Sequence, residues 1–424
     1  MIDLKILRES PEVISQMLKQ RNLSIPFDRL LSLDAERRSI LTRNQELKTR
    51  KNKASQKIAD RRKNGGDISS VLEEVRRVSQ EIFEGNEKAR RVEEELYSEF
   101  RNVPNLVHPS VPIGVDSSSN IELFRSGTPH VISGAKDHIT LAENLNLIDL
   151  KRAAKVAGSR FYYLTSELVR LNYALILFAL DFISTKGYVL VQPPYLLNRE
   201  ATSGAVILSD FEDVIYKIEG EDLYLIATSE HPLAAMHLNE IFGHAELPKR
   251  YAGVSPCFRK EAGAHGRDTK GIFRVHQFEK VELFVFSTPE DSWTEHEQML
   301  EHAKEFYQIL EIPFRVMLLS SGDMGKVASK TYDIEGWFPG QREFRELVSC
   351  SNCTDYQSRN LGIKFRNKPH EDSHFVHTLN STLVATERTL VAILENNQLG
   401  DGSIVVPRVL QKYVGGLETI RQKA

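Results

Sequence analysis

The sequence predicts an α+β protein with a long antiparallel coiled-coil arm near the N-terminus and a larger domain built on an antiparallel sheet with flanking helices. Two observations predict this class. Apolar residues recur every seven positions between residues 28 and 101, a stretch that contains no proline. Beyond residue 120, short β-rich runs come in pairs, as in hairpins, instead of alternating singly with helices. A proline- and serine-containing segment at 103–120 separates the two patterns, so we expect domains at 1–105 and 106–424.

The composition limits the classes of protein that fit. The chain has 424 residues, 41% hydrophobic and 27% charged, as in soluble proteins with two or three domains. A net charge of −3 excludes a protein that is basic overall, so any nucleic-acid-binding surface must be local. No run approaches the roughly 20 apolar residues of a membrane span, and the N-terminus lacks a signal-peptide pattern. Three cysteines fit a reducing compartment, and we expect a cytoplasmic protein.

The N-terminal part is predicted to be helical. Residues 1 to about 22 predict a short amphipathic helix that Pro26 ends. Two heptad-patterned helices follow, each of about 30 residues or roughly 45 Å, and the "NGGD" turn at 64–67 joins them. The expected seam residues are Leu33, Ile40, Leu47 and Ala54 in the first helix and Val75, Ile82, Ala89 and Leu96 in the second.

The distal half of the first arm helix is strongly basic. Its cationic residues include Lys48, Arg50, Lys51, Lys53, Lys57 and Arg61. Such a run is compatible with a merely solvated helix face. It is equally compatible with a basic stripe that follows a phosphate backbone.

The second domain begins with a helix and continues with strands. The apolar run at 168–183 predicts a helix, and "GYVLVQPPYLL" predicts a strand that ends at Pro193 and Pro194. Further strands are expected at 223–227, 273–286 and 314–319.

One predicted hairpin, at 257–284, combines both signs of charge with an aromatic residue. Arg259 and Glu261 alternate and would share one strand face, and Arg274, Phe278 and Glu282 are spaced by four, which again selects one face. Cations suit phosphates, an aromatic plane suits a purine, and carboxylates suit amines. Cross-strand ion pairs would explain the charges but not Phe278. Neither GxGxxG nor a P-loop sequence occurs, so the pattern indicates an ATP site of another kind.

Other segments add polar groups to this interpretation. Thr228 and Glu230 lie two residues apart just before an apolar helix, where Thr228 would also serve as an N-cap. Glu346 and Ser349 offer hard oxygen ligands suited to Mg²⁺ that is shared with phosphates. Arg388 opens a long apolar helix, where a guanidinium is unfavourable unless it meets an anion.

Cys350 and Cys353 form a CxxC pair. A structural zinc site needs four ligands, and the chain has no second CxxC to supply them. His374 and His377 lie downstream, but we favour two small residues in a buried turn.

Taken together, the segments resemble the seryl-tRNA synthetases, a family of class II aminoacyl-tRNA synthetases, over essentially the whole chain. "GYVLVQPPYLL" is similar to motif 1, "FRKEAGAHGRDTKGIFRVHQFEKVE" to motif 2 and "LNSTLVATERTLVAILE" to motif 3. "TSE" and "SCSNCTDYQSR" are specific to this family. The resemblance implies a class II catalytic domain, a homodimer with motif 1 at its interface, and a coiled-coil arm that grips the long variable arm of tRNA(Ser).

The resemblance also implies roles for single residues in ATP binding. Arg259 would contact the α-phosphate, Arg274 the far phosphates and Glu261 the adenine amino group. Phe278 and Arg388 would enclose the adenine, and the backbone of Val275 would contact the base. Arg259, Arg274 and Arg388 are the implied catalytic residues.

For Mg²⁺ and L-serine, the implied residues are the following. Glu346 and Ser349 would hold the metal. Glu282 would pair with the serine ammonium, and Thr228, Glu230, Thr382 and Arg259 would complete the amino-acid pocket. His265 would be a loop or tRNA-end contact rather than a base.

The implied reaction is serine activation by ATP to seryl-adenylate, followed by transfer to tRNA(Ser) in protein biosynthesis, with the charging of tRNA(Sec) left open. Three alternatives are an amino acid–carrier protein ligase, a non-catalytic synthetase paralogue and a coiled-coil scaffold. The arm disfavours the first of these, and the presence of Arg259, Glu282, Glu346 and Arg388 disfavours the second. Motif 3 departs from the family pattern, because "NSTLVATER" lacks the glycines of bacterial relatives and Glu387 stands where smaller residues are frequent.

Overall fold

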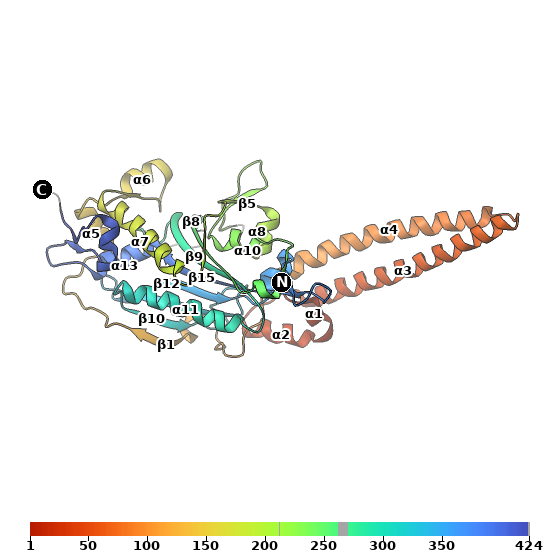
Figure 1. Cartoon of the computed structure of the whole chain (residues 1–424), viewed down its shortest axis with the longest axis horizontal. Helices are drawn as coiled ribbons and strands as arrows, with labels where there is room; N and C mark the ends of the chain where they lie inside the picture. Colours follow the sequence, from red (N-terminus) through yellow and green to blue (C-terminus); the bar gives the residue numbers. More distant parts are fainter. Residues whose placement is uncertain (212, 262–269, 423–424) are drawn as a thin grey trace. The chain divides into compact units, whose positions relative to one another are not determined.

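The computed structural model describes residues 1–211, 213–261 and 270–422 (Figure 1). His265 lies outside the described residues. The chain forms two compact units, one made of residues 3–19 and 23–104 and the other of residues 1–2, 20–22 and 105–424. Among the described residues, no helix combines the length and apolar character that a membrane span requires.

The first unit is entirely helical. It contains α1 (Leu4–Glu9), α2 (Pro11–Gln20), α3 (Phe27–Lys63) and α4 (Ser69–Phe100). The expected single helix over residues 1–22 is therefore wrong. The chain breaks at Ser10, and α2 begins at Pro11, a residue that lacks the backbone N–H and is favoured in a first helical turn.

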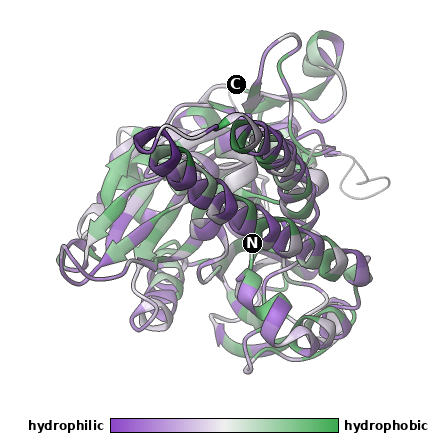
Figure 2. Ribbon diagram, turned by 90° about the vertical axis from the view of Figure 1, so that its right-hand side faces the viewer, coloured by the Kyte–Doolittle hydropathy of each residue, from purple (hydrophilic) through white to green (hydrophobic). Residues whose placement is uncertain are grey.

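The paired helices α3 and α4 confirm the predicted arm. Leu33, Leu47 and Ala54 are buried on α3, as are Ala89 and Leu96 on α4. Both helices are largely hydrophilic along their length (Figure 2), and their exposed positions are mainly polar. Five of the eight predicted seam residues are therefore buried, whereas Ile40, Val75 and Ile82 are half-buried, and α4 also buries Val71, Val78 and Val92.

Polar residues interrupt this seam at two levels. Asn44 is buried and donates to the side-chain oxygen of Asn86 at 3.1 Å. A side chain at Gly85 would collide with Asn44, since an added Cβ would lie 2.1 Å from its oxygen. Arg37 pairs with Glu93 at 2.6 Å. These specific contacts fix the alignment of the two helices.

The second unit is built on an eight-stranded sheet in the order β1-β10-β11-β12-β15-β9-β8-β4. The strands, in sheet order, are Ile121–Ser126, Phe314–Leu318, Lys330–Phe338, Glu343–Asn352, His377–Ala385, Gln277–Ser287, Lys249–Phe258 and Val189–Val191. All neighbours are antiparallel except β4 and β8. Helices α7 (Glu167–Ser184), α11 (Ser292–Ile309) and α13 (Thr386–Asn396) share one apolar core with this sheet, which confirms the predicted architecture.

Shorter elements surround this core. The helices are α5 (His138–Asn144), α6 (Leu150–Ala157), α8 (Arg199–Ala205), α9 (Leu208–Phe211), α10 (Glu230–Ala235), α12 (Tyr356–Leu361) and α14 (Arg408–Gln411). The strands are β2 (Ile148–Asp149), β3 (Tyr163–Leu164), β5 (Leu196–Asn198), β6 (Leu223–Leu225), β7 (Ile241–Gly243), β13 (Lys364–Arg366), β14 (His374–Phe375), β16 (Ile404–Val405) and β17 (Thr419–Ile420).

Several predicted strands are shorter than expected. The strand expected at 273–286 begins only at Gln277, and β8 ends at Phe258. Arg259, Glu261 and Arg274 therefore lie outside the regular ladder, and strand alternation is the wrong reason for their common orientation. The motif 1 run splits into β4 and β5 because Pro193 and Pro194 cannot donate to a ladder.

Candidate active site

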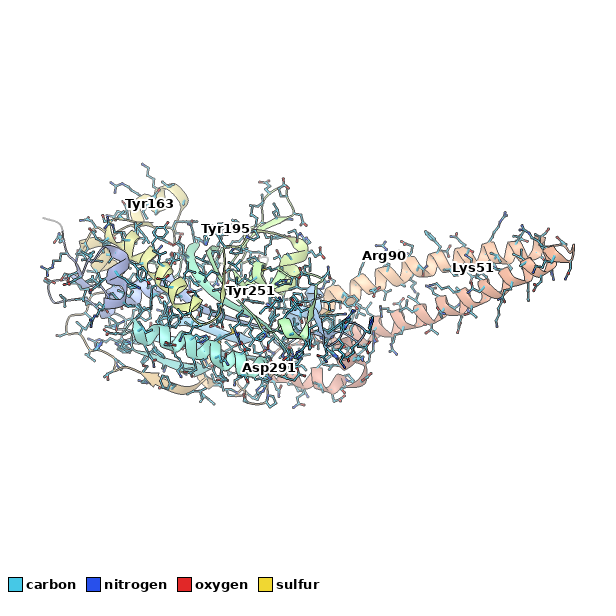
Figure 3. The ribbon with its side chains drawn as sticks, viewed as in Figure 1. Lys51, Arg90, Tyr163, Tyr195, Tyr251 and Asp291 are labelled. Atoms are coloured by element: carbon cyan, nitrogen blue, oxygen red, sulfur yellow. The ribbon has the colours of Figure 1, made fainter. Side chains whose placement is uncertain are left out.

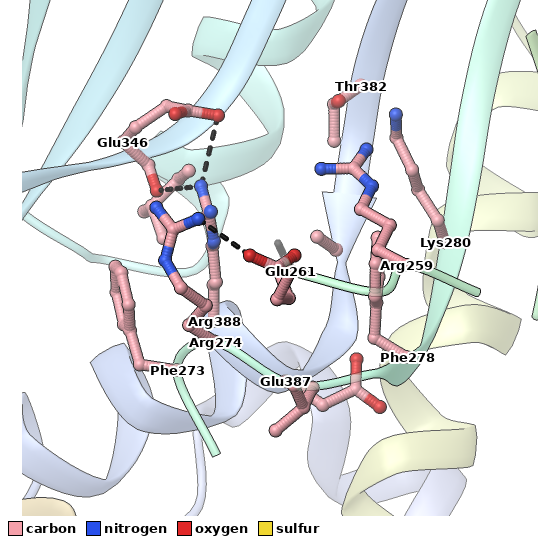
Figure 4. A pocket seen from close by; sticks show the side chains of 13 residues that line it. Arg259, Glu261, Phe273, Arg274, Phe278, Lys280, Glu346, Thr382, Glu387 and Arg388 are labelled. Atoms are coloured by element: carbon pink, nitrogen blue, oxygen red, sulfur yellow. Dashed lines mark hydrogen bonds and ion pairs between the residues drawn. The ribbon is translucent and has the colours of Figure 1, made fainter. Parts of the chain in front are cut away.

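The sheet carries a cavity of about 770 Å³ that continues into a much narrower slot of about 50 Å³. The slot is lined by Arg259, Glu261, Phe273, Arg274, Val275, Phe278, Lys280, Glu346, Leu347, Thr382, Ala385, Glu387 and Arg388 (Figure 4). Thr228, Glu230, Glu282 and Ser349 line the wider cavity. All residues that the sequence assigned to ATP, serine or Mg²⁺ thus lie around one continuous space.

Two aromatic rings and three guanidinium groups form the walls of the slot. Arg259 Cζ lies 5.0 Å from the centre of the Phe278 ring. On the other side, Arg388 Cζ lies 5.0 Å from the centre of the Phe273 ring, and Arg274 also lines the slot. Flat cations over aromatic rings make walls suited to a planar heterocycle.

Each of two arginines in the slot is paired with a carboxylate. Arg274 Nη1 lies 2.8 Å from Glu261 Oε2. Arg388 Nη1 lies 3.0 Å from Glu346 Oε1 and also donates to the Glu346 carbonyl oxygen at 3.1 Å. The Arg388 guanidinium lowers the pKa of Glu346 despite burial of that carboxyl group. The slot therefore holds ionised groups of both signs.

The wider cavity ends in a small polar pocket. Thr228 is buried on the segment before α10, and its hydroxyl accepts from Lys280 Nζ at 3.1 Å. Lys280 also pairs with Glu282. Gln357 donates to Glu230 at 2.9 Å. These groups place two carboxylates and one ammonium within a confined volume.

The two carboxylates of this pocket, Glu230 and Glu282, have pKa values above the ordinary value of a glutamate. Burial, reinforced by the nearby charge of Glu282, raises the pKa of Glu230 to about 7. Burial also raises the pKa of Glu282, although Lys280 opposes the shift. Both carboxylates would become easier to ionise if a further cation entered the pocket.

Acidic residues of β11 and β12 face the cavity beside the slot. In the register of the two strands, Asp333 lies opposite Ser349, and Glu335 lies opposite Glu346. Burial and the charge of Glu346 raise the pKa of Asp333 well above its ordinary value. Asp333 Oδ1 is buried, and among the described residues it has no hydrogen-bond donor. A cation bound beside Asp333 would offset the free-energy cost of burying this oxygen without a donor.

Lys280, Asp333 and Phe273 are among the lining residues that sequence reasoning missed. Lys280 lies midway between Phe278 and Glu282 on β9, so strict alternation would have revealed it. Asp333 comes from β11, a strand that the sequence pattern did not predict. Phe273 precedes Arg274 in the irregular segment before β9, and no periodicity marks it.

The basic residues of the arm lie along α3. Lys48, Arg50, Lys53, Lys57 and Arg61 are exposed and Lys51 is half-buried. Figure 3 labels Lys51 on this helix. Arg50 pairs with Glu74 at 2.6 Å, and Arg61 donates to the carbonyl oxygen of Asp67 at 3.1 Å. Within the described part of the chain, no ion pair engages the four lysines. Their charges are therefore available to an external anion.

The cysteines lie inside the second unit. Cys350 and Cys353 are buried free thiols, and Asn380 donates to Cys353 Sγ at 3.5 Å. His377 contacts the Ser292 hydroxyl at 2.7 Å instead of approaching the thiols. Across the described ranges, no three acidic, histidine or cysteine side chains are grouped as a metal site.

Comparison with known proteins identifies the family. The seryl-tRNA synthetase N-terminal domain matches residues 1–107, and the tRNA synthetase class II core domain (G, H, P, S and T) matches residues 214–397. The serine–tRNA ligase of Nitrosopumilus maritimus is 56% identical over 421 residues, which cover 99% of this chain and all of the relative.

Two solved structures have the same fold throughout. The seryl-tRNA synthetase of Pyrococcus horikoshii, solved in complex with ATP, has a TM-score of 0.95 at 46% identity and is covered completely, as is this chain. The cytoplasmic serine–tRNA ligase of Naegleria fowleri, solved with AMP, has a TM-score of 0.89 at 36% identity, with 100% of this chain and 99% of that one covered. The chain belongs to the seryl-tRNA synthetase family.

Proposed function

We propose that the chain activates L-serine with ATP to form seryl-adenylate and pyrophosphate, and then transfers the seryl group to the terminal ribose of tRNA(Ser). The observation that carries this proposal is the convergence of Arg259, Arg274 and Arg388 with Glu346 around the slot. The relatives that match the chain over its whole length are serine–tRNA ligases, and one was solved with ATP.

In this proposal the adenine enters the slot. Phe278 and Arg388 lie on opposite sides of the slot (Figure 4) and would enclose the base. Glu261 would accept from the adenine amino group, and the Val275 backbone would contact the ring. The triphosphate would then extend toward Arg259 and Arg274 at the junction with the wider cavity.

Mg²⁺ fits the acidic side of this junction. Glu346 and Ser349 offer hard oxygens, and Asp333 adds a buried carboxylate oxygen that has no hydrogen-bond donor among the described residues. Since the described side chains do not form a complete metal site by themselves, phosphate oxygens would complete the coordination. When bound, the metal would supply positive charge beside the phosphates.

The polar pocket at the other end of the cavity would receive serine. Glu282 would pair with the substrate ammonium, while Thr228, Glu230 and Thr382 surround it. A pocket that hydrogen-bonds the substrate hydroxyl rejects alanine, because its own polar groups would otherwise remain unpaired.

Activation requires no general base. The serine carboxylate is ionised at neutral pH and attacks the α-phosphorus directly, with pyrophosphate as the leaving group. Arg259 would hold the α-phosphate in line and, with Arg274 and Arg388, offset the charge that develops. In the second step, the terminal ribose hydroxyl attacks the seryl carbonyl and AMP leaves.

The arm would bind tRNA(Ser). Lys48, Lys51, Lys53 and Lys57, which form no ion pair among the described residues, would offer a basic face to the phosphate backbone of the long variable arm. Recognition through this arm leaves room for tRNA(Sec) as a second substrate, and the proposal places the reaction in the cytoplasm.

The proposal also includes a homodimer. Apolar side chains remain exposed on the motif 1 region: Tyr173 and Leu177 of α7, at 55% and 49%, and Val189 and Leu190 of β4, at 59% and 45%. A cluster of this kind on an edge strand and its neighbouring helix suits an isologous interface. Light scattering at micromolar concentration should give twice the mass of the chain.

Serine-dependent ATP–pyrophosphate exchange and the charging of a tRNA(Ser) transcript with labelled serine together test the proposed function. Exchange without charging of tRNA(Ser) would favour a carrier-protein ligase. The absence of both activities from the folded protein would favour a non-catalytic paralogue. A tRNA(Sec) transcript in the same assay decides the second substrate.

A further inference from the structure

Glu387 lies buried between the end of β15 and Arg388, with 2% of its surface exposed. Its carboxylate accepts the backbone N–H of Glu279 at distances of 3.1 and 3.3 Å. It also accepts the Thr386 hydroxyl at 3.0 Å and the hydroxyl of Tyr162. Burial raises the pKa of Glu387 to about 7, although these donors oppose the shift. The Glu387 carboxylate is therefore a buried acceptor for several hydrogen bonds, a role that a smaller apolar residue at this position could not fill.

The bond to Glu279 replaces a missing strand contact. The ladder between β15 and β9 ends at the pair Ala385–Lys280. Glu279 is the next residue along β9, and there the partner chain has already turned into α13. Its N–H would be left unpaired in the interior, which is unfavourable, and the Glu387 carboxylate takes the place of the strand carbonyl.

This contact joins the two walls of the slot. Glu279 directly follows Phe278, and Glu387 directly precedes Arg388. Phe278 and Arg388 face the slot from opposite sides, with Glu387 below them (Figure 4). A second contact secures the same strand end, because Asn172 of α7 donates to the Glu279 carboxylate. Glu387 thus connects the strand that carries Phe278 with the helix that carries Arg388.

We infer that Glu387 is a positioning residue for adenine recognition: by binding the Glu279 N–H it sets the distance between Phe278 and Arg388. The inference rests on the proposed function, in which these two side chains enclose the base. Glu387 also lines the slot, but in this inference it acts through the two walls that it connects. Its loss should weaken the binding of the base without affecting the triphosphate or serine.

The test compares Glu387→Ala with Glu387→Gln in serine-dependent ATP–pyrophosphate exchange. The alanine variant loses the acceptor and should raise the KM for ATP about tenfold, the scale of one buried hydrogen bond left unmade. Its KM for serine should stay within about twofold of wild type, as expected for a contact outside that pocket. The glutamine variant keeps an acceptor oxygen at the same place and should restore most of the affinity for ATP.

Two competitive inhibitors separate the base from the phosphates. The inhibition constant of adenosine should rise with the KM for ATP in Glu387→Ala, whereas that of inorganic tripolyphosphate should not change. A matched control is Glu297→Ala. The Glu297 carboxylate also accepts a tyrosine hydroxyl, that of Tyr332 at 2.8 Å, but it does not line the slot. Its inhibition constants should match those of wild type.

The outcomes of these measurements distinguish a failure of the proposed function from a failure of the inference about Glu387. A wild-type protein without serine-dependent exchange overturns the proposed function itself. Active wild type together with an unchanged KM for ATP in Glu387→Ala overturns only the inference. Equal losses of ATP, serine and tripolyphosphate binding, together with a lower melting temperature, would also overturn it, because they indicate a general structural role. If the alanine variant does not fold, Tyr162→Phe, which removes one donor to Glu387, should still raise the inhibition constant of adenosine selectively.

Discussion

Glu261 and Arg274 are ion-paired across the mouth of the slot, with 2.8 Å between Glu261 Oε2 and Arg274 Nη1. Neither residue belongs to a strand. Glu261 has a positive φ of 50°, an uncommon conformation for a residue with a side chain, and this turn aims its carboxylate at Arg274. The pair therefore determines where the guanidinium lies relative to the proposed phosphate path.

The first prediction concerns this pair. Glu261→Gln should raise the KM for ATP about tenfold, because it removes the charge that orients Arg274 and leaves a single acceptor oxygen to serve both Arg274 and the adenine amino group. In a double-mutant cycle with Arg274→Gln, measured by pyrophosphate exchange, the coupling free energy should be about 1 kcal/mol or more. Strict additivity of the two single effects would show that the ion pair does not contribute to catalysis.

A second prediction concerns Arg259, which donates to the Ala227 carbonyl at 3.2 Å and lies over Phe278. Arg259→Ala should lower the rate of adenylate formation about 10²-fold or more, as when one preorganised charge contact to a transition state is lost. Arg250→Ala provides the control, since Arg250 pairs with Glu295 away from the site. A near-normal exchange rate in Arg259→Ala would remove this residue from the site.

The third prediction is a pH dependence of serine binding. The pKa of Glu230 is about 7, above its ordinary value, so the carboxylate ionises as the pH rises through 7 and then attracts the substrate ammonium. The KM for serine should therefore fall between pH 6 and 8, and Glu230→Gln should flatten this dependence. A pH profile that is the same in both proteins would argue against the role of Glu230.

The same shift has a consequence for stability. Because the pKa of Glu230 is raised in the folded protein, its contribution to stability is present at low pH and is lost as the pH rises through 7. Added serine should offset this loss. The increase in melting temperature caused by serine should accordingly be larger at pH 8 than at pH 6.

A fourth prediction separates the two steps of the reaction. Deleting residues 38–92 and joining the ends with a short glycine linker keeps the Arg37–Glu93 pair at 2.6 Å as the closing contact. The truncated protein should retain serine activation and lose tRNA charging, because it lacks the basic stripe. A point variant, Lys48→Glu with Lys53→Glu, should weaken charging and make it less sensitive to salt. Wild-type charging by the truncated protein would refute the role of the arm.

Much of the fold and of the site could be predicted because the information is local in sequence. The heptads define the arm, and the motifs bring arginine, aromatic and carboxylate residues to one cavity. The individual roles of these residues, and the functional boundary at residue 105, stay predictions.

What the pattern could not predict depends on contacts between distant segments. Arg259 N donates to the carbonyl oxygen of His276 at 2.9 Å, and Lys260 N donates to that of Val214 at 2.7 Å. The first bond continues the register of the β8–β9 ladder by one pair, and the second carries the chain away from the ladder earlier than alternation suggests. In the same way, Arg21 is buried and donates to the carbonyl oxygens of Asn105 and Ala328, so residues 20–22 belong with the second unit.

The early end of the β8–β9 ladder at Phe258 and Gln277 has a practical consequence for protein engineers. The paired strands of motif 2 are separated by the segment 259–276, which contains Arg259 and Arg274, the arginines proposed to contact the phosphates. Chimaeras that exchange only residues 259–276 between synthetases should therefore keep the paired strands and Phe278 while they change the proposed phosphate contacts, which makes this segment suitable for directed evolution.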